Sequence, residues 1–268
     1  MREELDEAKR LAVDAGAILL QYYSTSHTVD WKAPGDPVTV ADRSASTFIV
    51  EHLRRRFPKD GILSEEEPDD RTRLKHSRVW MIDPMDGTRE FIEHRGEFAV
   101  MIGLAIDGVP VVGAVYQPTT EKLYFGAADS GSFLQFKDSV TPLHVSTEHV
   151  ASRMTLAVSR SHRSSRVEQI RQRLGVKEVI ASGSVGLKVG LLCEGRAHIY
   201  VHAGGRTNIW DTCAPDAILR EAGGRMTDIS NAPLKYDQPE VRNLNGLVAT
   251  NGIVHDRVVK VTQSVIIS

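Results

Sequence analysis

Two aspartates, Asp83 and Asp86, follow an apolar segment at residues 79–82 and are held three positions apart by a turn that contains Pro84. Four consecutive apolar residues predict a strand covered on both faces, and sheets of this kind place their ligands beyond the carboxyl ends of the strands. Carboxylate oxygens prefer hard cations such as Mg²⁺, which keeps some waters and engages substrate phosphates. The pair therefore predicts a metal site for phosphate chemistry. A single D-x-x-D-G segment is more often an Asp-rich turn that caps a short helix, here residues 88–93, so one motif does not decide.

Two further acidic segments share this pattern. Glu65 belongs to an acidic run, residues 65–67, that follows the short apolar segment 62–63. Asp211 opens a predicted helix whose apolar positions lie within residues 217–222. Each has a simpler interpretation, because aspartate is a favoured helix N-cap and an acidic run is commonly a solvated surface. Three such segments in one chain favour a shared site.

Taken together, the three segments resemble the inositol monophosphatase-like family of lithium-sensitive, magnesium-dependent phosphatases. The family pattern is S/G-E-E, then D-P-x-D-G-T, then W-D-x-x-A followed by E-A-G-G, and this chain carries these motifs in order at residues 64–66, 83–88, 210–214 and 221–224. The resemblance implies an α+β fold, a layered α-β-α-β-α sandwich. It also implies two or three Mg²⁺ ions per site, held by Glu65, Asp83, the carbonyl of Met85, Asp86 and Asp211.

The same resemblance assigns Asp42 and Thr88 to the pair that orients and deprotonates the attacking water. Asp42 also lies at the start of a predicted helix, residues 42–53, where a carboxylate compensates the helix dipole, so a purely structural role is the alternative. Two cations about 3.5 to 4 Å apart clamp the entering and the leaving oxygen of an in-line phosphoryl displacement, which explains why so many acids would converge.

The second half of the chain bears on the substrate. Residues 156–162 predict a strand that runs into a polar turn, and residues 182–188 predict a Gly/Ser turn that opens a helix and exposes N–H groups to a phosphate. The motifs S-R-S-H, G-S-x-G-L-K and W-D-T-C-A-P resemble the 3'(2'),5'-bisphosphate nucleotidase branch of the family. This branch implies removal of the 3'-phosphate of adenosine 3',5'-bisphosphate, giving AMP and phosphate. It places the following residues on the substrate: Gly87, Thr88, Ser159, His162, Ser184, Lys188 and Arg206.

One departure leaves the base and ribose contacts open, because residues 201–208 lack the Y-P-R-L/F-G-P-T stretch of the bacterial enzymes. The same Gly-rich loop would admit a smaller substrate, so an inositol or other polyol monophosphatase is the alternative enzyme. A catalytically silent nucleotide-binding sensor is the alternative from another class, and the complete acid set argues against it. The expected partner is a small phosphate ester, and dimers are common in the family.

The composition argues against several other classes of protein. With 33 basic and 35 acidic residues the formal charge is −2, and no basic face with interleaved aromatics indicates a nucleic-acid polymer as partner. Cys193 and Cys213 give neither a disulfide framework nor a metal-binding pair. Residues 5–19 predict an amphipathic helix instead of a signal peptide, and no apolar run reaches the roughly 18 residues of a membrane span. We therefore expect a cytoplasmic protein.

Hydrophobic patterns divide the chain near residue 148. Before this point, helices are followed by hairpin strands, as at residues 99–106 and 111–116, and this predicts an α+β domain over residues 1–148 with most of the metal ligands. Beyond it, strands and helices alternate, which predicts an α/β domain over residues 149–268 with a mixed or parallel sheet. The second domain would carry the substrate segments and Asp211.

Overall fold

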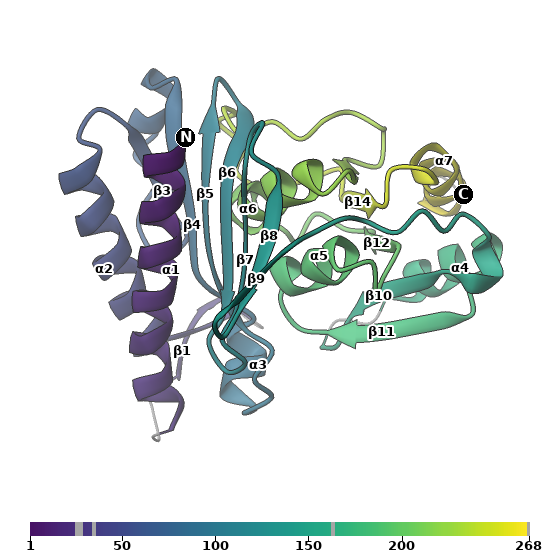
Figure 1. The fold of residues 1–268 in the computed structure, drawn as a ribbon, viewed down its shortest axis with the longest axis horizontal. Helices are drawn as coiled ribbons and strands as arrows, with labels where there is room; N and C mark the ends of the chain where they lie inside the picture. Colours follow the sequence, from purple (N-terminus) through teal and green to yellow (C-terminus); the bar gives the residue numbers. More distant parts are fainter. Residues whose placement is uncertain (25–28, 34–35, 162–163, 267–268) are drawn as a thin grey trace.

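The computed structural model describes residues 1–24, 29–33, 36–161 and 164–266 of the chain. Within them, two large β-sheets alternate with three layers of helices in the order α-β-α-β-α (Figure 1). The layered α+β sandwich predicted from the sequence is thus confirmed. A separate two-stranded hairpin is formed by β1 (Val29–Ala33) and β2 (Asp36–Thr39). None of the helices in these ranges is long and apolar enough to cross a membrane.

The larger sheet has seven strands in the order β3-β4-β5-β6-β7-β8-β9. These are β3 (Gly61–Ser64), β4 (Arg78–Asp86), β5 (Ala99–Ile106), β6 (Val109–Gln117), β7 (Lys122–Ala127), β8 (Ser132–Phe136) and β9 (Ser139–Pro142). β3 and β4 are parallel, and the other neighbouring pairs are antiparallel. Helices α1 (Arg2–Tyr23) and α2 (Val40–Arg56) cover one face of this sheet (Figure 1), because their apolar residues recur at helical spacing and are buried against it.

The smaller sheet has five strands in the order β11-β10-β12-β14-β13. These are β10 (Thr155–Ser159), β11 (Glu178–Ser182), β12 (Ile199–His202), β13 (Arg225–Thr227) and β14 (Leu247–Thr250). β10 is parallel to both of its neighbours, whereas β14 is antiparallel to both of its own, so the sheet is mixed as predicted. Helices α4 (Ser165–Leu174) and α7 (His255–Ile266) form the outer layer, and α5 (Val185–Cys193) and α6 (Ile209–Glu221) lie between the two sheets (Figure 1). The remaining helices are short: η1 (Thr72–Lys75), α3 (Thr88–Ile92) and η2 (Ala151–Arg153).

The strand that carries the two aspartates is longer than predicted. We expected it to end at Asp83, but β4 continues to Asp86. Its pairing with β5 shifts on the way, since Asp83 lies opposite Met101 whereas Asp86 lies opposite Ala99. The extra residue forms a β-bulge around Pro84, which has no N–H to donate to the ladder. Residues three apart in a regular strand point to opposite faces, and the bulge removes that restriction for the two aspartates.

Helix α6 packs closely on the larger sheet through two glycines. A Cβ atom at Gly113 would lie 2.2 Å from the carbonyl oxygen of Ala214, and one at Gly103 would lie 2.7 Å from the amide nitrogen of Ala214. Only glycine allows a helix backbone to approach strands this closely. The contact fixes the first turn of α6, which carries Asp211, relative to β5 and its neighbour β4.

The two halves of the chain share a core. The chain leaves the larger sheet after β9 and enters the smaller one at β10, on either side of the boundary predicted near residue 148. One apolar cluster nevertheless combines Met81 and Met101 from the first half with Leu187 and Ile218 from the second. The division into domains 1–148 and 149–268 stays a prediction.

A buried histidine anchors α7 to the smaller sheet. The side chain of His255 is fully buried, with Nε2 2.8 Å from Thr227 Oγ1 and Nδ1 3.0 Å from Thr250 Oγ1. Burial lowers the pKa of His255 to about 4, with a further decrease from Arg225 and an opposing effect from Asp256. The imidazole is therefore neutral in the folded protein at physiological pH.

The lowered pKa of His255 predicts that the folded protein loses stability in mild acid. The folded pKa lies below the unfolded value of about 6.5, so the unfolded chain takes up the proton first and stability falls as pH falls below about 6.5 toward 4. We expect His255 to contribute a slope of up to about 1.4 kcal/mol per pH unit in this window. Urea denaturation of wild type and His255→Gln at pH 7.5, 6.5 and 5.5 measures it. Parallel pH profiles for the two proteins would contradict the prediction.

Candidate active site

Four carboxylates converge where β3 and β4 end and α6 begins. Glu65 directly follows β3, and its N–H donates to the carbonyl of Ile82 at 3.1 Å, which places it beside Asp83 on the neighbouring strand. Burial raises the pKa of Asp83 well above its usual range, and the negative charges of Glu65, Asp86 and Asp211 raise it further. Burial likewise raises the pKa of Asp211, followed by the charges of Asp86 and Glu65. So many carboxylates in one buried space repel one another unless a cation neutralises them.

Two of these carboxylates are oriented by the backbone that surrounds them. Asp83 Oδ1 accepts the N–H of Met85 at 2.9 Å, across the bulge. Asp211 Oδ2 accepts the N–H of Asn208 at 2.7 Å and thereby completes the capping box of α6. The alternative in which Asp211 is the N-cap is not realised, because Asn208 is the N-cap of α6 and Asp211 is the third residue of the helix.

Asp86 is held from the other half of the chain, by the N-terminus of α5. Its Oδ2 atom accepts the hydroxyl of Ser184 at 2.6 Å, the N–H of Gly186 at 3.2 Å and the N–H of Val185. A helix N-terminus is a favourable place for a negative charge because its first N–H groups lack partners within the helix. The α5 turn therefore fixes one oxygen of Asp86.

The donor set fits Mg²⁺. Its atoms are carboxylate oxygens together with the carbonyl oxygen of Met85, which is the chemistry that hard cations prefer. Among the described residues, no three His, Cys, Asp or Glu side chains already surround a common point as metal ligands. One oxygen of Asp86 is hydrogen-bonded to Ser184 at the start of α5, and one oxygen of Asp211 is hydrogen-bonded to Asn208. The residues that would hold Mg²⁺ here are Glu65, Asp83, Met85 through its carbonyl, Asp86 and Asp211.

Asp42 and Thr88 meet beside this cluster. Asp42 is 2 % exposed, and its Oδ2 accepts the N–H and the hydroxyl of Thr39 at 2.7 and 2.6 Å in the capping box of α2. The hydroxyl oxygen of Thr88, the first residue of α3, lies 3.2 Å from Asp42 Oδ1 and 3.2 Å from the carbonyl oxygen of Met85. Gly87 precedes it with a φ of 99°, which favours glycine at this cap. One oxygen of Asp42 thus caps a helix, and the other is within reach of Thr88.

Lys188 lies elsewhere than the resemblance implied. We expected its ammonium on a substrate phosphate, but the side chain is 3 % exposed and donates to the carbonyls of Gly183 at 2.8 Å and Ser184 at 2.5 Å. Burial lowers the pKa of Lys188 to about 8, although Asp86 and the other nearby acids act to raise it. Ser184 likewise donates to Asp86 in place of a phosphate. Both residues support the turn before α5, because the carboxylate of Asp86 already occupies the anion position at this helix.

Two other residues predicted to contact substrate border a large cavity. Its volume is about 960 Å³, and Ser159 and Arg206 line it together with Ser161, Tyr200 and His202. None of the four carboxylates lines this cavity, but Tyr200, which does, has its pKa raised by burial and then by the charges of Asp86 and Asp211. The remaining predicted contact, His162, lies outside the described residues.

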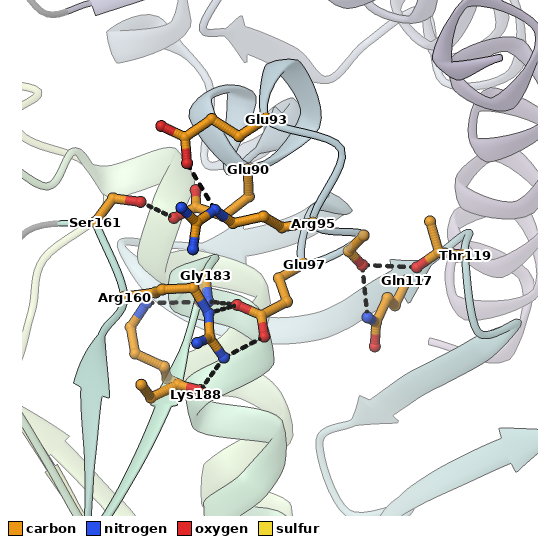
Figure 2. A network of polar contacts seen from close by, with 12 residues as sticks. Glu90, Glu93, Arg95, Glu97, Gln117, Thr119, Arg160, Ser161, Gly183 and Lys188 are labelled. Atoms are coloured by element: carbon orange, nitrogen blue, oxygen red, sulfur yellow. Dashed lines mark hydrogen bonds and ion pairs between the residues drawn. The ribbon is translucent and has the colours of Figure 1, made fainter.

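The motifs did not single out a polar network that borders the site. Arg160 donates to both carboxylate oxygens of Glu97 at 2.5 Å each, Glu97 also accepts the N–H of Gly183 at 2.8 Å, and Ser161 donates to Glu90 (Figure 2). Arg160 is the second letter of S-R-S-H, which is its only signal in the sequence. Glu90 and Glu97 belong to no motif, so only the fold reveals their proximity.

Comparison with known proteins supports the family resemblance over nearly the whole length of the chain. Residues 1–266 match the family model described as the inositol monophosphatase family. The chain is 36% identical over 248 residues to the 3'(2'),5'-bisphosphate nucleotidase CysQ of Escherichia coli strain K12, covering 88% of this chain and 95% of the relative. It is 32% identical over 238 residues to the CysQ of Haemophilus influenzae, covering 88% of each chain.

Solved structures of the same fold include an IMPase and a CysQ. The IMPase of Thermotoga maritima is similar at a TM-score of 0.84 and 26% identity, covering 98% of both chains. The CysQ of Bacteroides thetaiotaomicron is similar at a TM-score of 0.80 and 29% identity, covering 92% of this chain and 97% of that structure.

Proposed function

Because this chain belongs to the inositol monophosphatase family and is a phosphatase of that family, we propose that it hydrolyses the 3'-phosphate of adenosine 3',5'-bisphosphate and requires Mg²⁺. The products are AMP and phosphate. The observation that carries the choice of substrate is the cavity of about 960 Å³ lined by Ser159, Arg206 and Tyr200, the last of which lies within electrostatic range of Asp86 and Asp211. Small-molecule sites commonly measure about 300–1,000 Å³, and this cavity has room for a nucleoside beside the phosphate.

The lining of the cavity suits a nucleotide. Apolar walls from Leu156, Val158 and Val179 offer a surface for a base, and the hydroxyls of Ser159 and Ser161 lie at the exit of β10. Arg206 adds a positive charge for the second phosphate. The curated relatives of this chain that carry the nucleotidase name support the same substrate class.

The residues of the chain have separate roles in the hydrolysis. Glu65, Asp83, Asp86, Asp211 and the carbonyl of Met85 would hold Mg²⁺, which would supply charge neutralisation at the phosphoryl oxygens and a water of lowered pKa. Thr88 orients the attacking water through its hydroxyl, and the proton passes by way of Thr88 Oγ1 to Asp42 Oδ1, 3.2 Å away. The water oxygen forms the new bond to phosphorus, the bond from phosphorus to the 3'-oxygen breaks, and the leaving oxygen takes up a proton from solvent. The N-terminus of α6 adds a favourable dipole for the anionic substrate.

A polyol monophosphatase is the second candidate, favoured by the TM-score of 0.84 with the Thermotoga maritima IMPase. Phosphate release from adenosine 3',5'-bisphosphate and from inositol 1-phosphate, measured side by side with and without Mg²⁺, separates the candidates. A higher kcat/KM for the nucleotide supports the proposal, and a higher value for the inositol ester selects the second candidate. Nucleotide binding without release from either ester would identify a silent sensor.

Because Arg206 lines the cavity, we expect its replacement to affect the nucleotide and the inositol ester differently. We expect Arg206→Met to raise KM for the nucleotide about tenfold, because a hydrogen bond to a charged group contributes about 1.5–3 kcal/mol, and to leave KM for inositol 1-phosphate nearly unchanged. Arg153→Met is the matched control, since Arg153 is an exposed arginine of the same half that pairs with Glu148 away from the cavity. Equal changes of KM for both substrates would contradict this role of Arg206.

A further inference from the structure

The turn that precedes α5 has an unfavourable backbone conformation that depends on contacts with surrounding residues. Ser184 has a φ of 39°, which is unfavourable for a residue with a side chain. Its neighbour Gly183 has no room for a side chain, since a Cβ atom there would lie 2.2 Å from the carbonyl oxygen of Glu97. The turn therefore depends on the contacts that surround it.

Those contacts come from both sides of the turn. Lys188 donates to the carbonyls of Gly183 and Ser184 from within α5, as described above. On the opposite side, the N–H of Gly183 donates to Glu97 Oε2 at 2.8 Å. One oxygen of Asp86 accepts three hydrogen bonds from this turn, donated by the Ser184 hydroxyl and by the N–H groups of Val185 and Gly186. A displacement of the turn would thus move the partners of a carboxylate in the cluster.

Glu97 is itself held by one arginine. Arg160 binds both of its oxygens at 2.5 Å, and the same guanidinium donates to the carbonyl of Ala181 at 2.8 Å (Figure 2). Burial acts to raise the pKa of Glu97, but Arg160 and the N–H of Gly183 together lower it below its usual value. A bidentate pair of this kind fixes orientation as well as distance. Arg160 therefore determines where the carboxylate of Glu97 lies.

The position of this ion pair in the fold connects the two halves at the cluster. Glu97 lies two residues before Ala99, which is paired with Asp86 across β4 and β5. Arg160 lies one residue after β10, and its N–H donates to the carbonyl of Ser182 beside the turn. The ion pair thus joins the segment that leads into β5, the neighbour of the strand carrying Asp86, to the segment beside the turn that holds the Asp86 carboxylate.

From this geometry we propose that Arg160 and Glu97 are positioning residues that set the affinity for the cation at Asp86. They touch neither the cation nor the substrate. They act through the Gly183–Ser184 turn, whose donors orient the Asp86 carboxylate. The inference rests on the proposed function, because it assumes that Asp86 is a ligand for Mg²⁺.

The test is the affinity for Mg²⁺ measured by isothermal titration calorimetry. Partners that orient a metal ligand typically change metal affinity about 10–100-fold, so we expect Arg160→Met to raise the Kd for Mg²⁺ at least about tenfold. The kcat of this variant should recover at saturating Mg²⁺. Glu97→Gln should raise the Kd less, because its amide oxygen still accepts the N–H of Gly183.

Arg78→Met is the matched control for lost stability. Arg78 begins β4, at the opposite end from Asp86, and pairs with Asp60 and Glu4 at 2.9 Å each. Its side chain is 30 % exposed, compared with 34 % for Arg160. We expect Arg78→Met to lower the melting temperature and to leave the Kd for Mg²⁺ unchanged.

The outcomes separate this inference from the function on which it rests. If wild type binds Mg²⁺ and releases phosphate, but Arg160→Met and Glu97→Gln bind Mg²⁺ as tightly as Arg78→Met, the positioning role alone is overturned. If the wild-type protein neither binds Mg²⁺ nor releases phosphate, the proposed function fails and the positioning role fails with it. A raised Kd in both variants at the site, with the control unchanged, supports the inference.

Discussion

Replacing Asp83 with asparagine is expected to abolish magnesium-dependent phosphate release and, at the same time, to raise the melting temperature of the metal-free protein. Burial and three neighbouring acids raise the pKa of Asp83, so desolvation and like charge both destabilise its ionised form when no cation is bound. Asparagine removes that charge and keeps the oxygen that accepts the N–H of Met85. Loss of a ligand that supplies several kcal/mol of charge stabilisation corresponds to a decrease in kcat/KM of about a thousandfold or more.

The two effects are measured by phosphate release with Mg²⁺ and by thermal unfolding in EDTA. Each kcal/mol of relieved repulsion corresponds to about 2–4 °C in a chain of this size class. Asp216→Asn is the matched control, because Asp216 is also a fully buried aspartate but is paired with Arg220 at 2.8 Å outside the cluster. That variant should unfold at a lower temperature and keep its activity. A lower melting temperature for metal-free Asp83→Asn would contradict the repulsion inferred here.

The second large effect is expected at Thr88. Proton transfer by a positioned side chain contributes about 10²–10⁴-fold to the rate, so we expect Thr88→Val to reduce kcat by about this factor. Valine keeps the shape of threonine and removes only the hydroxyl that lies 3.2 Å from Asp42 Oδ1. The Kd for Mg²⁺ should change little, because the ligand oxygens are left in place.

Thr88→Ser completes the comparison at this position. Serine restores the hydroxyl without the methyl group, and we expect most of the activity to return. Steady-state kinetics at saturating Mg²⁺ give kcat for the three proteins, and calorimetry gives the Kd. A Thr88→Val variant with near-wild-type kcat would remove Thr88 from the path of the proton and leave Asp42 with its helix-capping role alone.

The acidic segments could be found in the sequence because each is local, whereas the layered sandwich, which the structure confirms, and the set of metal ligands were implied by the family resemblance. The apolar segments before Glu65 and Asp83 indicate the ends of strands, and Asp211 lies in the first turn of a helix. The bulge between Asp83 and Asp86 was not predicted, because it depends on how β4 pairs with β5 and not on the sequence of β4 alone. The predicted end of that strand was consequently wrong by several residues.

The contacts around α5 escaped prediction for a different reason. From the sequence, Lys188 is a cation in the first turns of a helix that opens with Gly and Ser, which suits a phosphate site. In the fold, the Ser184 hydroxyl donates to Asp86, a residue 98 positions earlier in the chain than Ser184. The partnership of Glu97 with Arg160 is equally non-local, with 63 positions between them. Such pairings are set by the packing of the two halves, which no local pattern records.

The close packing of α6 against Gly103 and Gly113 limits which mutations this site tolerates. The position of Asp211 is fixed where the helix backbone at Ala214 rests on the strands, with no side chain from the two glycines in between. A side chain at either position would therefore push the helix backbone away from the sheet and move this acid with it. The two halves therefore meet through two kinds of contact, a shared core of apolar side chains and a close backbone approach at Ala214 that leaves no space for a Cβ atom at Gly103 or Gly113.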